Sequence, residues 1–483
     1  MNAVATAYPI AALIDGQWVT SAVTFAVTDP ATGDEIARVP DLGANETRLA
    51  IDAASRALPA WSARTAKDRG NILRRWFDLI TAETESLARL MTAEQGKPLS
   101  ESRGEVVYGA SFVEWFAEEG KRAYGRTIPT TVGSRRYITI KQPVGVVAAI
   151  SPWNFPIAMI TRKVAPALAS GCTIVVKPSE ETPLCALAIA KLAQDAGVPA
   201  GVFNVVTTTN AAAVGKVMCD DDRVRKLTFT GSTAVGKALY RQCAETVKKL
   251  TLELGGNAPL IVFDDADIEQ AVAGAMASKY RNAGQTCVCA NRILVQSGIY
   301  EKFADALVKA VAKLHVAPGS DPQSTIGPLI NAKAARKVET LLADALAKGA
   351  KVRTGGGRPL PGPLFVQPSV ITGVTPDMDI TKEEIFGPVA ALMRFDTEAD
   401  AIRLANDTPF GLAAYLFSQN LSRAWRVAEQ LDAGMIGVND GIFSNEVVPF
   451  GGVKQSGLGR EGAAEGLDEY LETKFICLGG ITS

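Results

Sequence analysis

Residues 173–183 show how this chain is organised. They read Thr173-Ile174-Val175-Val176-Lys177-Pro178-Ser179-Glu180-Glu181-Thr182-Pro183. The apolar, largely β-branched run Thr173–Val176 predicts a short buried strand. Thr182-Pro183 is typical of the start of a helix, which we expect to continue to Asp195, with Gly197 beyond its end. A buried strand, a polar turn and a helix in succession are typical of a parallel α/β sheet.

The same unit recurs on both sides of this stretch. Further strands are predicted at Gly145–Ile150, Phe203–Val206, Lys226–Phe229 and Leu250–Leu254. Helices are predicted at Ile157–Ala169 and from Ala211 and Thr233 onward. Before them, residues 1 to about 45 indicate short strands and turns, and residues 45–116 indicate helices. Because continuous apolar strands alternate with amphipathic helices, we predict an α/β fold with a doubly wound, mainly parallel sheet.

A second α/β unit is predicted from about Gly255 to Ile436. Its expected helices are Asp267–Asn282, Tyr300–Leu314 and Ala332–Lys348, and its expected strands include Ile293–Gln296 and Val389–Phe395. Residues 354–363 are expected to form a loop. Two further strand-like runs, Tyr137–Ile140 and Lys474–Leu478, are expected to pair as an edge ribbon that a second subunit could join.

Composition limits the kind of protein. With 483 residues, the chain is expected to form two or three domains. Its 50 basic and 51 acidic residues form no block of like charge, which argues against nucleic acid or an anionic membrane as a partner. Prolines and Asn154 interrupt the apolar run Val144–Ile160, so it is not predicted to span a membrane. The first residues show no signal-peptide pattern, and the seven cysteines are irregularly spaced, so we expect a cytoplasmic protein.

Cys287 is the first candidate for chemistry. It lies in the small-residue stretch Arg281–Arg292, after a helical pattern and before a strand, where a thiolate could act as a nucleophile. A buried packing cysteine is the alternative, and this stretch alone does not decide between the two. The single histidine, His315, is expected to be structural, at the C-terminal end of a helix. A carboxylate is therefore the expected general base.

Polar residues lie at the ends of several predicted strands. Asn154, Lys177 and the pair Gly231-Ser232 come after strands, and Glu253 ends the last one. In such sheets, ligands bind beyond the carboxyl ends of the strands. The Gly231-Ser232 turn suits a phosphate, but it could be a helix cap alone. Glu180 is either a carboxylate for ribose hydroxyls or an acid favoured near a helix N-terminus. The position of Glu253 tends to raise its pKa and make it a usable base, and a buried salt bridge is the alternative.

Six motifs together resemble the aldehyde dehydrogenase superfamily. They are Pro152–Pro156, Lys177–Glu180, Phe229–Ser232, Leu252–Asn257, Gly284–Cys287 and Glu384–Pro388, and they occur in the family's order. The resemblance implies two Rossmann-like doubly wound α/β domains and a small β ribbon for oligomerisation into a homodimer or homotetramer. The implied NAD(P)-binding domain comprises residues 1–126 and 142–254, the catalytic domain residues 255–436, and the ribbon residues 127–141 and 464–483. Residues 437–463 would be a substrate-side loop that returns to the cofactor domain.

The resemblance also assigns roles. Cys287 would attack the aldehyde carbon, Asn154 would hold the oxyanion, and Glu253 would activate water to release the acid from a thioester. No metal is expected. NAD would be preferred and NADP tolerated, because Glu180 would repel a 2′-phosphate although Lys177 and Ser179 could donate to it. The implied cofactor contacts are Trp153, Lys177, Ser179, Glu180, Gly231, Ser232, Leu254, Glu384 and Phe386.

Within the superfamily, the chain most resembles the succinate-semialdehyde dehydrogenase branch. The resemblance rests on Cys287-Val288-Cys289, on Arg281 and on the segment Pro449–Gly457. The implied substrate is a small aldehyde with a distal carboxylate, held by Arg162, Arg281 and Ser444. Because a methylene contributes only about 1–3 kcal/mol of discrimination, glutarate semialdehyde is the close rival.

The arginines, the acyl acceptor and Cys289 each allow a second interpretation. Either arginine could pair with a structural acid such as Glu446 instead of a substrate. An acylating, coenzyme A-dependent relative would share the thioester, but Glu253 argues against it because a hydrolytic base would waste the thioester. A non-enzymatic structural role would not need these catalytic residues. Cys289 is implied to form an oxidant-driven disulfide with Cys287, or it is a packing cysteine.

Overall fold

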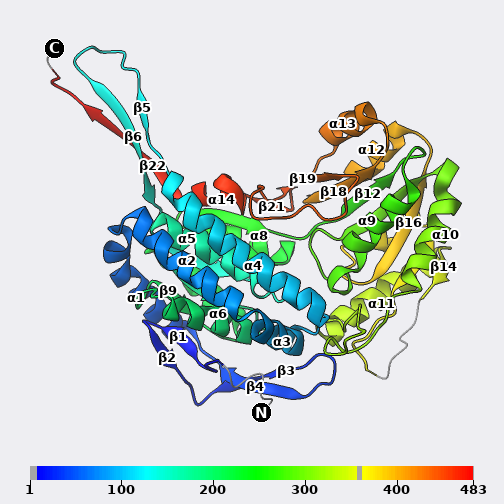
Figure 1. Cartoon of the computed structure of the whole chain (residues 1–483), viewed down its shortest axis with the longest axis horizontal. Coiled ribbons are helices and arrows are strands. Elements are labelled where there is room, and N and C mark those ends of the chain that lie inside the picture. The colour runs from blue at the N-terminus through cyan, green and yellow to red at the C-terminus, as the bar shows by residue number, and fades with distance from the viewer. Residues whose placement is uncertain (1–7, 356–361, 482–483) are drawn as a thin grey trace.

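A computed structural model describes residues 8–355 and 362–481 of the chain. Two α/β units lie side by side, and a narrow three-stranded ribbon projects from the first of them (Figure 1). Three of the predicted segments extend into residues outside the described ranges. These are the N-terminal strands and turns at residues 1–7, the loop at residues 356–361 and the C-terminal segment at residues 482–483.

The first unit is built on an eight-stranded sheet. Its strands are β1 (Ala12–Ile14), β2 (Gln17–Val19), β7 (Val146–Ile150), β8 (Thr173–Lys177), β9 (Phe203–Val205), β10 (Val224–Thr230), β11 (Lys249–Glu253) and β21 (Gly457–Leu458). Its helices are α1 (Ala44–Ser62), α2 (Ala66–Ala82), α3 (Thr84–Gln95), α4 (Leu99–Glu119), α5 (Ala158–Ser170), α6 (Pro183–Asp195), α7 (Ala211–Asp220) and α8 (Thr233–Ala244). The strand order is β2-β1-β9-β8-β7-β10-β11-β21, with the five strands from β9 to β11 parallel. The hairpin of β3 (Thr24–Thr28) and β4 (Glu35–Pro40) is separate.

Both faces of the central strands are buried, which explains their continuous apolar sequences. In β7, Val146 and Ala148 belong to a core formed with α1, α7 and α8. Val147 and Ala149 point to the opposite face and belong to a core formed with α2, α4, α5 and α6. The predicted doubly wound sheet is therefore confirmed.

The second unit contains a seven-stranded sheet. Its strands are β12 (Ala258–Val262), β13 (Ala290–Gln296), β14 (Lys351–Thr354), β15 (Ser369–Thr372), β16 (Val389–Phe395), β18 (Ala413–Phe417) and β19 (Met435–Val438). Its helices are α9 (Ile268–Tyr280), α10 (Tyr300–Val311), α11 (Ala332–Ala347), α12 (Glu398–Asn406) and α13 (Leu421–Gln430). The order is β14-β15-β16-β13-β12-β18-β19, and only β14 pairs antiparallel.

After the second sheet, the chain returns to the first. A two-residue strand, β17 (Phe410–Gly411), pairs with β20 (Val453–Lys454). Directly afterwards, β21 pairs with the end of β11, where Leu458 lies opposite Leu252 and Gly457 opposite Glu253. The segment around residues 450–458 therefore lies beside β11, whose last residue is the predicted base, Glu253.

The projecting ribbon joins two distant parts of the sequence. Its strands are β5 (Arg126–Ile128), β6 (Arg136–Pro143) and β22 (Leu471–Leu478), and a short helix, α14 (Ala463–Asp468), precedes β22. Strand β22 pairs antiparallel with β6 along its whole length, with Ile476 opposite Ile138. The ribbon extends away from both units (Figure 1). The predicted pairing of the two strand-like runs is confirmed, and the joining of a second subunit stays a prediction.

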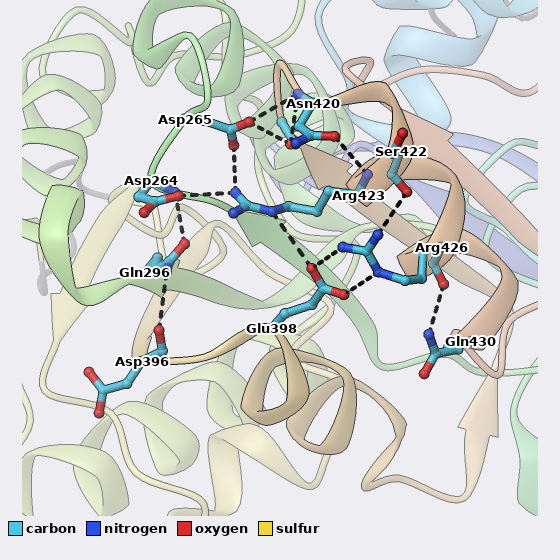
Figure 2. Close-up of polar contacts among 11 residues, drawn as sticks. Asp264, Asp265, Gln296, Asp396, Glu398, Asn420, Ser422, Arg423, Arg426 and Gln430 are labelled. Carbon is cyan, nitrogen blue, oxygen red and sulfur yellow. Dashed lines mark hydrogen bonds and ion pairs between the residues drawn. The ribbon is translucent and has the colours of Figure 1, made fainter.

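A polar network fastens α12 and α13 to strand ends of the second sheet (Figure 2). The Arg423 guanidinium lies 2.9 Å from Asp265 and 3.0 Å from Asp264, which follow β12. Glu398, at the start of α12, accepts two hydrogen bonds from Arg426, each 2.8 Å long. Ion pairs therefore occupy this carboxyl edge of the second sheet.

The structure corrects two predicted helix ends. The helix expected at Tyr300–Leu314 ends at Val311, so His315 is an exposed residue beyond it and not a C-terminal helix residue. The His315 backbone N–H instead donates to Thr325 Oγ1 at 2.7 Å. The helix expected at Asp267–Asn282 ends at Tyr280, because the chain turns sharply afterwards. In the described part of the chain, no helix is both long and apolar enough to cross a bilayer.

Candidate active site

The parallel register of the first sheet brings the predicted polar residues to one edge. Ile150 is paired with Lys177 across β7 and β8, and Thr230 is paired with Glu253 across β10 and β11. The loop containing Asn154 follows β7, and the Gly231-Ser232 turn follows β10. Strands that end at one level place their following loops together, as expected for a ligand site in a doubly wound sheet.

Cys287 lies in a loop between α9 and β13. The backbone enters this loop through left-handed conformations at Asn282, with φ of 51°, and Ala283, with φ of 54°. The Gln285 side chain fixes the loop from inside, since its Oε1 accepts from the Ile330 N–H at 2.9 Å and its Nε2 donates to the Asn282 carbonyl at 3.1 Å. Cys287 is only partly buried, so this loop presents its thiol as the candidate nucleophile.

Hydrogen bonds join Asn154 of the first unit to the Cys287 loop of the second. The Asn154 side-chain amide donates to the Gln285 carbonyl at 3.1 Å. The Asn154 carbonyl accepts from Lys97 Nζ at 2.8 Å and from Asn282 Nδ2 at 3.0 Å. One N–H of the Asn154 amide is engaged by the loop, and the second has no acceptor within the described ranges. These contacts set the orientation of Asn154 relative to Cys287.

Glu253 is a buried carboxyl group. Its side chain is almost inaccessible, and within the described ranges neither of its oxygens has a hydrogen-bond partner. Burial raises the pKa of Glu253 well above its usual value, and the negative charge of Glu461 adds to that shift. A Cβ at Gly451 would lie 3.0 Å from Glu253 Oε1, so a side chain there would crowd the carboxyl. The structure therefore shows no salt bridge to Glu253 among the described residues.

Arg162 forms a buried ion pair with Glu461, not with Glu446. Arg162 Nε lies 2.6 Å from Glu461 Oε2, and Lys163 binds the other Glu461 oxygen. Burial works against the Arg162 charge, but the Glu461 carboxylate raises the pKa of Arg162 overall. Both Cys287 and Glu253 contribute to that shift, so Arg162 is near both. Its Nη1 is buried and has no acceptor in the described part of the chain.

Arg281 lies directly after α9, at the entrance to the Cys287 loop. Its guanidinium lies 5.3 Å from the centroid of the Phe155 ring. Its charge acts on the thiol of Cys287 and on the carboxyl of Glu101. Among residues 8–355 and 362–481, the Arg281 guanidinium has no hydrogen-bond or ion-pair partner. The third predicted substrate contact, Ser444, is partly buried in the loop between β19 and β20.

Tyr108 of α4 is a site residue that the sequence did not reveal. Burial raises the pKa of its hydroxyl, and the charges of Arg162 and Arg281 oppose the shift, so both arginines lie near the hydroxyl. The Tyr108 ring packs edge-on against Phe112, with centroids 5.0 Å apart. Because Tyr108 lies 179 positions before Cys287, only the packing of α4 brings the two together.

Lys177 and Glu180 are paired with each other. The Lys177 Nζ lies 2.8 Å from Glu180 Oε2, and the Glu180 side chain is 45% exposed. Ser179 is buried, and its hydroxyl accepts from the Glu181 N–H at 3.3 Å. Ser232 caps α8 by accepting from the Val235 N–H at 3.4 Å. The predicted anion-binding groups therefore lie at the edge of the first sheet, with the Glu180 carboxylate partly neutralised by Lys177.

Four further predicted cofactor residues lie where the two units meet. Trp153 and Phe386 pack edge-on with centroids 5.6 Å apart, and Phe386 has a left-handed φ of 53°. The partly buried Glu384 carboxylate accepts from the Gly256 N–H at 3.1 Å, and loss of hydration raises the pKa of Glu384 to about 7. Leu254 is buried, and its N–H donates to the carbonyl of residue 456 at 2.9 Å.

Charged residues around Cys287 have opposing effects on the pKa of its thiol. Burial raises the pKa of its thiol to about 12, and the negative charges of Glu384 and Glu253 add to the shift. Arg162 and Arg281 act in the opposite direction and favour the thiolate. The ionisation of Cys287 therefore depends on those two cations and on any group that can take its proton.

Comparison with protein families and curated proteins identifies close relatives of the chain. Residues 18–476 match the model of the "Aldehyde dehydrogenase family". The chain is 59% identical to the succinate-semialdehyde dehydrogenase [NADP(+)] of Escherichia coli, over 97% of both chains. It is 57% identical to the glutarate-semialdehyde dehydrogenase of Pseudomonas aeruginosa, over 97% of this chain and 98% of that protein.

Solved structures show the same similarity. A crystal structure described as an E. coli NADP-dependent enzyme superposes with a TM-score of 0.97 at 58% sequence identity, and 98% of each chain is covered. The succinate-semialdehyde dehydrogenase structure from Burkholderia pseudomallei gives the same three values. The similarity extends over both α/β units and the ribbon.

Proposed function

The chain belongs to the aldehyde dehydrogenase family, and we propose that it oxidises succinate semialdehyde to succinate with NAD(P). The observation that carries the proposal is that two guanidinium groups have N–H donors that lack acceptors among the described residues. Within those ranges, Arg162 Nη1 is buried and unpaired, and Arg281, which opens the Cys287 loop, has no ion pair. A carboxylate at the far end of a short substrate could bind both arginines while its aldehyde carbon reaches the sulfur.

The side chains around this pocket carry more positive than negative charge. Glu461 is one carboxylate shared by two cations, Arg162 and Lys163. The added charge of Arg281 completes a site for an anion. We propose that Tyr108 and Ser444 add hydroxyl donors to the same carboxylate.

A second candidate substrate, glutarate semialdehyde, is one methylene longer. The relative from P. aeruginosa carries that name and is nearly as similar to this chain as the E. coli relative. A single methylene contributes only about 1–3 kcal/mol of discrimination, so both aldehydes are expected to be oxidised.

The residues at the sheet edge fit a dinucleotide cofactor. The backbone N–H groups in the first turn of α8 have no helical acceptors, and such groups suit a diphosphate. We propose that Lys177, Ser179, Glu180 and Glu384 hold the riboses, and that Gly231, Ser232, Leu254, Trp153 and Phe386 line the cofactor path. When bound, the nicotinamide accepts the hydride of the substrate.

Both NAD and NADP are proposed as cofactors. The Lys177 ammonium offsets the charge of Glu180, which weakens the expected repulsion of a 2′-phosphate. The E. coli relative is also named for NADP. The preference for NAD therefore stays a prediction.

Cys287 begins the proposed reaction. Its thiolate attacks the aldehyde carbon, and the carbonyl oxygen becomes an oxyanion. The free N–H of the Asn154 amide and the backbone N–H of Cys287 donate to that oxygen, which typically lowers the barrier by a few kcal/mol. Because the Gln285 carbonyl already holds the other Asn154 N–H, the donor is oriented before the substrate arrives. Loss of hydride then leaves a thioester on Cys287.

Glu253 completes the proposed cycle. Its ionised form, the carboxylate, takes a proton from water, because neither oxygen is engaged by a hydrogen bond among the described residues. The resulting hydroxide attacks the thioester carbon, and the Cys287 sulfur leaves as the acid forms. Because Glu253 would promote hydrolysis of the thioester, its presence argues against transfer of the acyl group to coenzyme A. The expected cytoplasmic location and the assembly into a dimer or tetramer remain predictions.

Substitution of the nucleophile tests the proposal. Cys287→Ala should abolish the formation of succinate and of reduced cofactor while cofactor affinity changes little. Reduced-cofactor formation should not require coenzyme A in the unsubstituted enzyme. Turnover by Cys287→Ala within about tenfold of the unsubstituted enzyme, which corresponds to a barrier change of only about 1.4 kcal/mol, would sink the assignment.

A further inference from the structure

Cys219 and Cys243 form a buried thiol pair outside the candidate active site. Cys219 lies near the end of α7, and Cys243 lies near the end of α8. Their sulfur atoms are 3.5 Å apart, and the two residues are 0% and 1% exposed. Since the sulfurs of a disulfide are about 2.0 Å apart, a closure of about 1.5 Å would join them.

We propose that Cys219 and Cys243 are an oxidisable pair, which hydrogen peroxide converts into a disulfide that clamps α7 to α8. One thiolate attacks a peroxide oxygen and breaks the O–O bond, which gives a sulfenic acid and, with one proton, water. The second thiol then attacks the sulfenic sulfur, forms the S–S bond and releases a second water. Two thiols and one hydrogen peroxide thus give one disulfide and two waters, and two electrons pass from sulfur to oxygen.

Lys248 makes the pair more reactive than two isolated buried thiols. Its ammonium donates to the carbonyls of Asp221, at 2.7 Å, and Val224, at 2.8 Å, which hold it near the sulfurs. The contact with the Cys219 thiol lowers the pKa of Cys243, and the Lys248 charge acts in the same direction. The same contact raises the pKa of Cys219. The Lys248 charge therefore favours a thiolate within this pair.

The position of Cys243 gives a small oxidant a route to the sulfurs. Cys243 lies in the last turn of α8, whose final residue Ala244 is exposed. Beyond it, Val247 is 88% exposed and has a left-handed φ of 50°, which is strained for a β-branched residue. The Thr246 hydroxyl ties this end with long hydrogen bonds of 3.3 and 3.4 Å to the carbonyls of Cys219 and Cys243. Fraying of such a helix end exposes the pair transiently.

The clamp is separate from the proposed catalytic function. Because α8 has 12 residues, its C-terminal end lies about 18 Å along the helix axis from the Ser232 turn. Oxidation at Cys219 and Cys243 should therefore stabilise the first unit without blocking the cofactor turn. In the chain-entropy account, joining residues 24 positions apart restricts the unfolded chain substantially.

Peptide mapping of the full-length protein tests the clamp. The reduced protein is treated with hydrogen peroxide, its remaining thiols are alkylated, and it is digested with trypsin without reductant. Cleavage after Lys216, Arg223, Arg241 and Lys248 releases peptides 217–223 and 242–248. We expect these two peptides joined, lighter by two hydrogens than their sum, and separated again by dithiothreitol. The thermal unfolding midpoint of the oxidised protein should also rise and fall back on reduction.

Matched variants identify the pair. Cys243→Ser should leave peptide 217–223 alkylated and remove the rise in the unfolding midpoint, and Cys243→Ala serves if the serine is not tolerated. Cys477→Ser removes a single exposed cysteine and should leave the cross-link intact. Recovery of both peptides as separate alkylated or sulfonated species, at peroxide doses that oxidise Cys477, would overturn the proposal. That negative result can be obtained with the unsubstituted protein, so the test does not depend on the folding of any variant.

Discussion

Arg162 donates from Nε to Glu461 Oε2 at 2.6 Å, in an ion pair whose side chains are 0% and 2% exposed. The other Glu461 oxygen binds Lys163, so one carboxylate serves two cations. Replacing Arg162 would therefore leave Glu461 with an altered set of partners and disturb the core. Arg281, which has no ion pair within the described ranges, is the better position for testing the carboxylate site.

Arg281→Ala should lower kcat/KM for succinate semialdehyde by about 10- to 100-fold, the typical loss of a charge-assisted hydrogen bond in a pocket. The uncharged substrate butanal, which cannot use the guanidinium, should be affected far less. Steady-state kinetics with both aldehydes give the comparison. An equal loss for the two substrates, or no loss for either, would remove Arg281 from the carboxylate site.

Glu253→Gln should spare hydride transfer and slow the hydrolysis of the thioester. A pre-steady-state burst of reduced cofactor should then precede a slow steady state. Only the ionised carboxylate acts as a base, and burial raises the pKa of Glu253, so hydrolysis should strengthen as pH rises through that raised pKa and weaken below it. The variant should lack this acid limb. Loss of the burst with the fold intact would indicate another role for Glu253.

Glu180→Gln should shift the cofactor ratio toward NADP. Loss of the carboxylate frees the Lys177 ammonium, so kcat/KM for NADP relative to NAD should rise by about two- to fivefold, as for a partly exposed ion pair. Glu181→Gln is a matched control, because the Glu181 carboxylate binds Asn331 Nδ2 at 2.7 Å and has no predicted cofactor contact. An unchanged ratio in Glu180→Gln would show that Glu180 does not discriminate between the cofactors.

Elements with strong local signals could be predicted from the sequence. Helix α6 begins at Pro183 and ends at Asp195, as predicted, because proline at the first turn and glycine beyond the end act locally. The end of α9 could not be predicted. An alanine in the left-handed region, as at residue 283, is unfavourable locally and is stabilised only by the surrounding fold.

The candidate site likewise contains residues whose positions could be predicted from the sequence and residues whose positions could not. The strand-end positions of Lys177 and Glu253 follow from the pattern of apolar strands, so the sequence predicted them. The partner of Arg162 was missed, because Glu461 lies 299 positions away and reaches Arg162 only when the chain returns to the first unit. Tyr108 was missed for a similar reason, since nothing in α4 distinguishes it from other aromatic residues that pack against the core.

Arg423→Ala should destabilise the second unit more than Arg426→Ala. Arg423 contacts Asp264, Asp265 and the ring of Phe263, at 4.9 Å, and its side chain is 24% exposed. Among the acidic residues that the structure describes, Arg426 binds Glu398 alone, and its side chain is 53% exposed. We expect losses of about 1–2 kcal/mol for Arg423 and below about 1 kcal/mol for Arg426 in denaturant unfolding. Equal losses would show that the network in Figure 2 does not depend on Arg423.

Cys289→Ala should make peroxide inactivation harder to reverse. Cys289 is buried, with its sulfur 3.6 Å from the carbonyls of Lys279 and Ala290, so a disulfide with Cys287 requires the loop to rearrange. If that disulfide forms, it shields Cys287 from further oxidation, and dithiothreitol restores activity. In Cys289→Ala, an oxidised Cys287 has no such partner and should proceed to irreversible acids.

Mass spectrometry of tryptic peptide 282–292, which contains both Cys287 and Cys289, separates this disulfide from one at Cys219 and Cys243. The unsubstituted enzyme should lose two hydrogens within that single peptide as activity falls. If inactivation of Cys289→Ala remains fully reversible by dithiothreitol, the protective disulfide is refuted, because reversibility would then not depend on the second sulfur. Cys289 would be a packing residue of the loop.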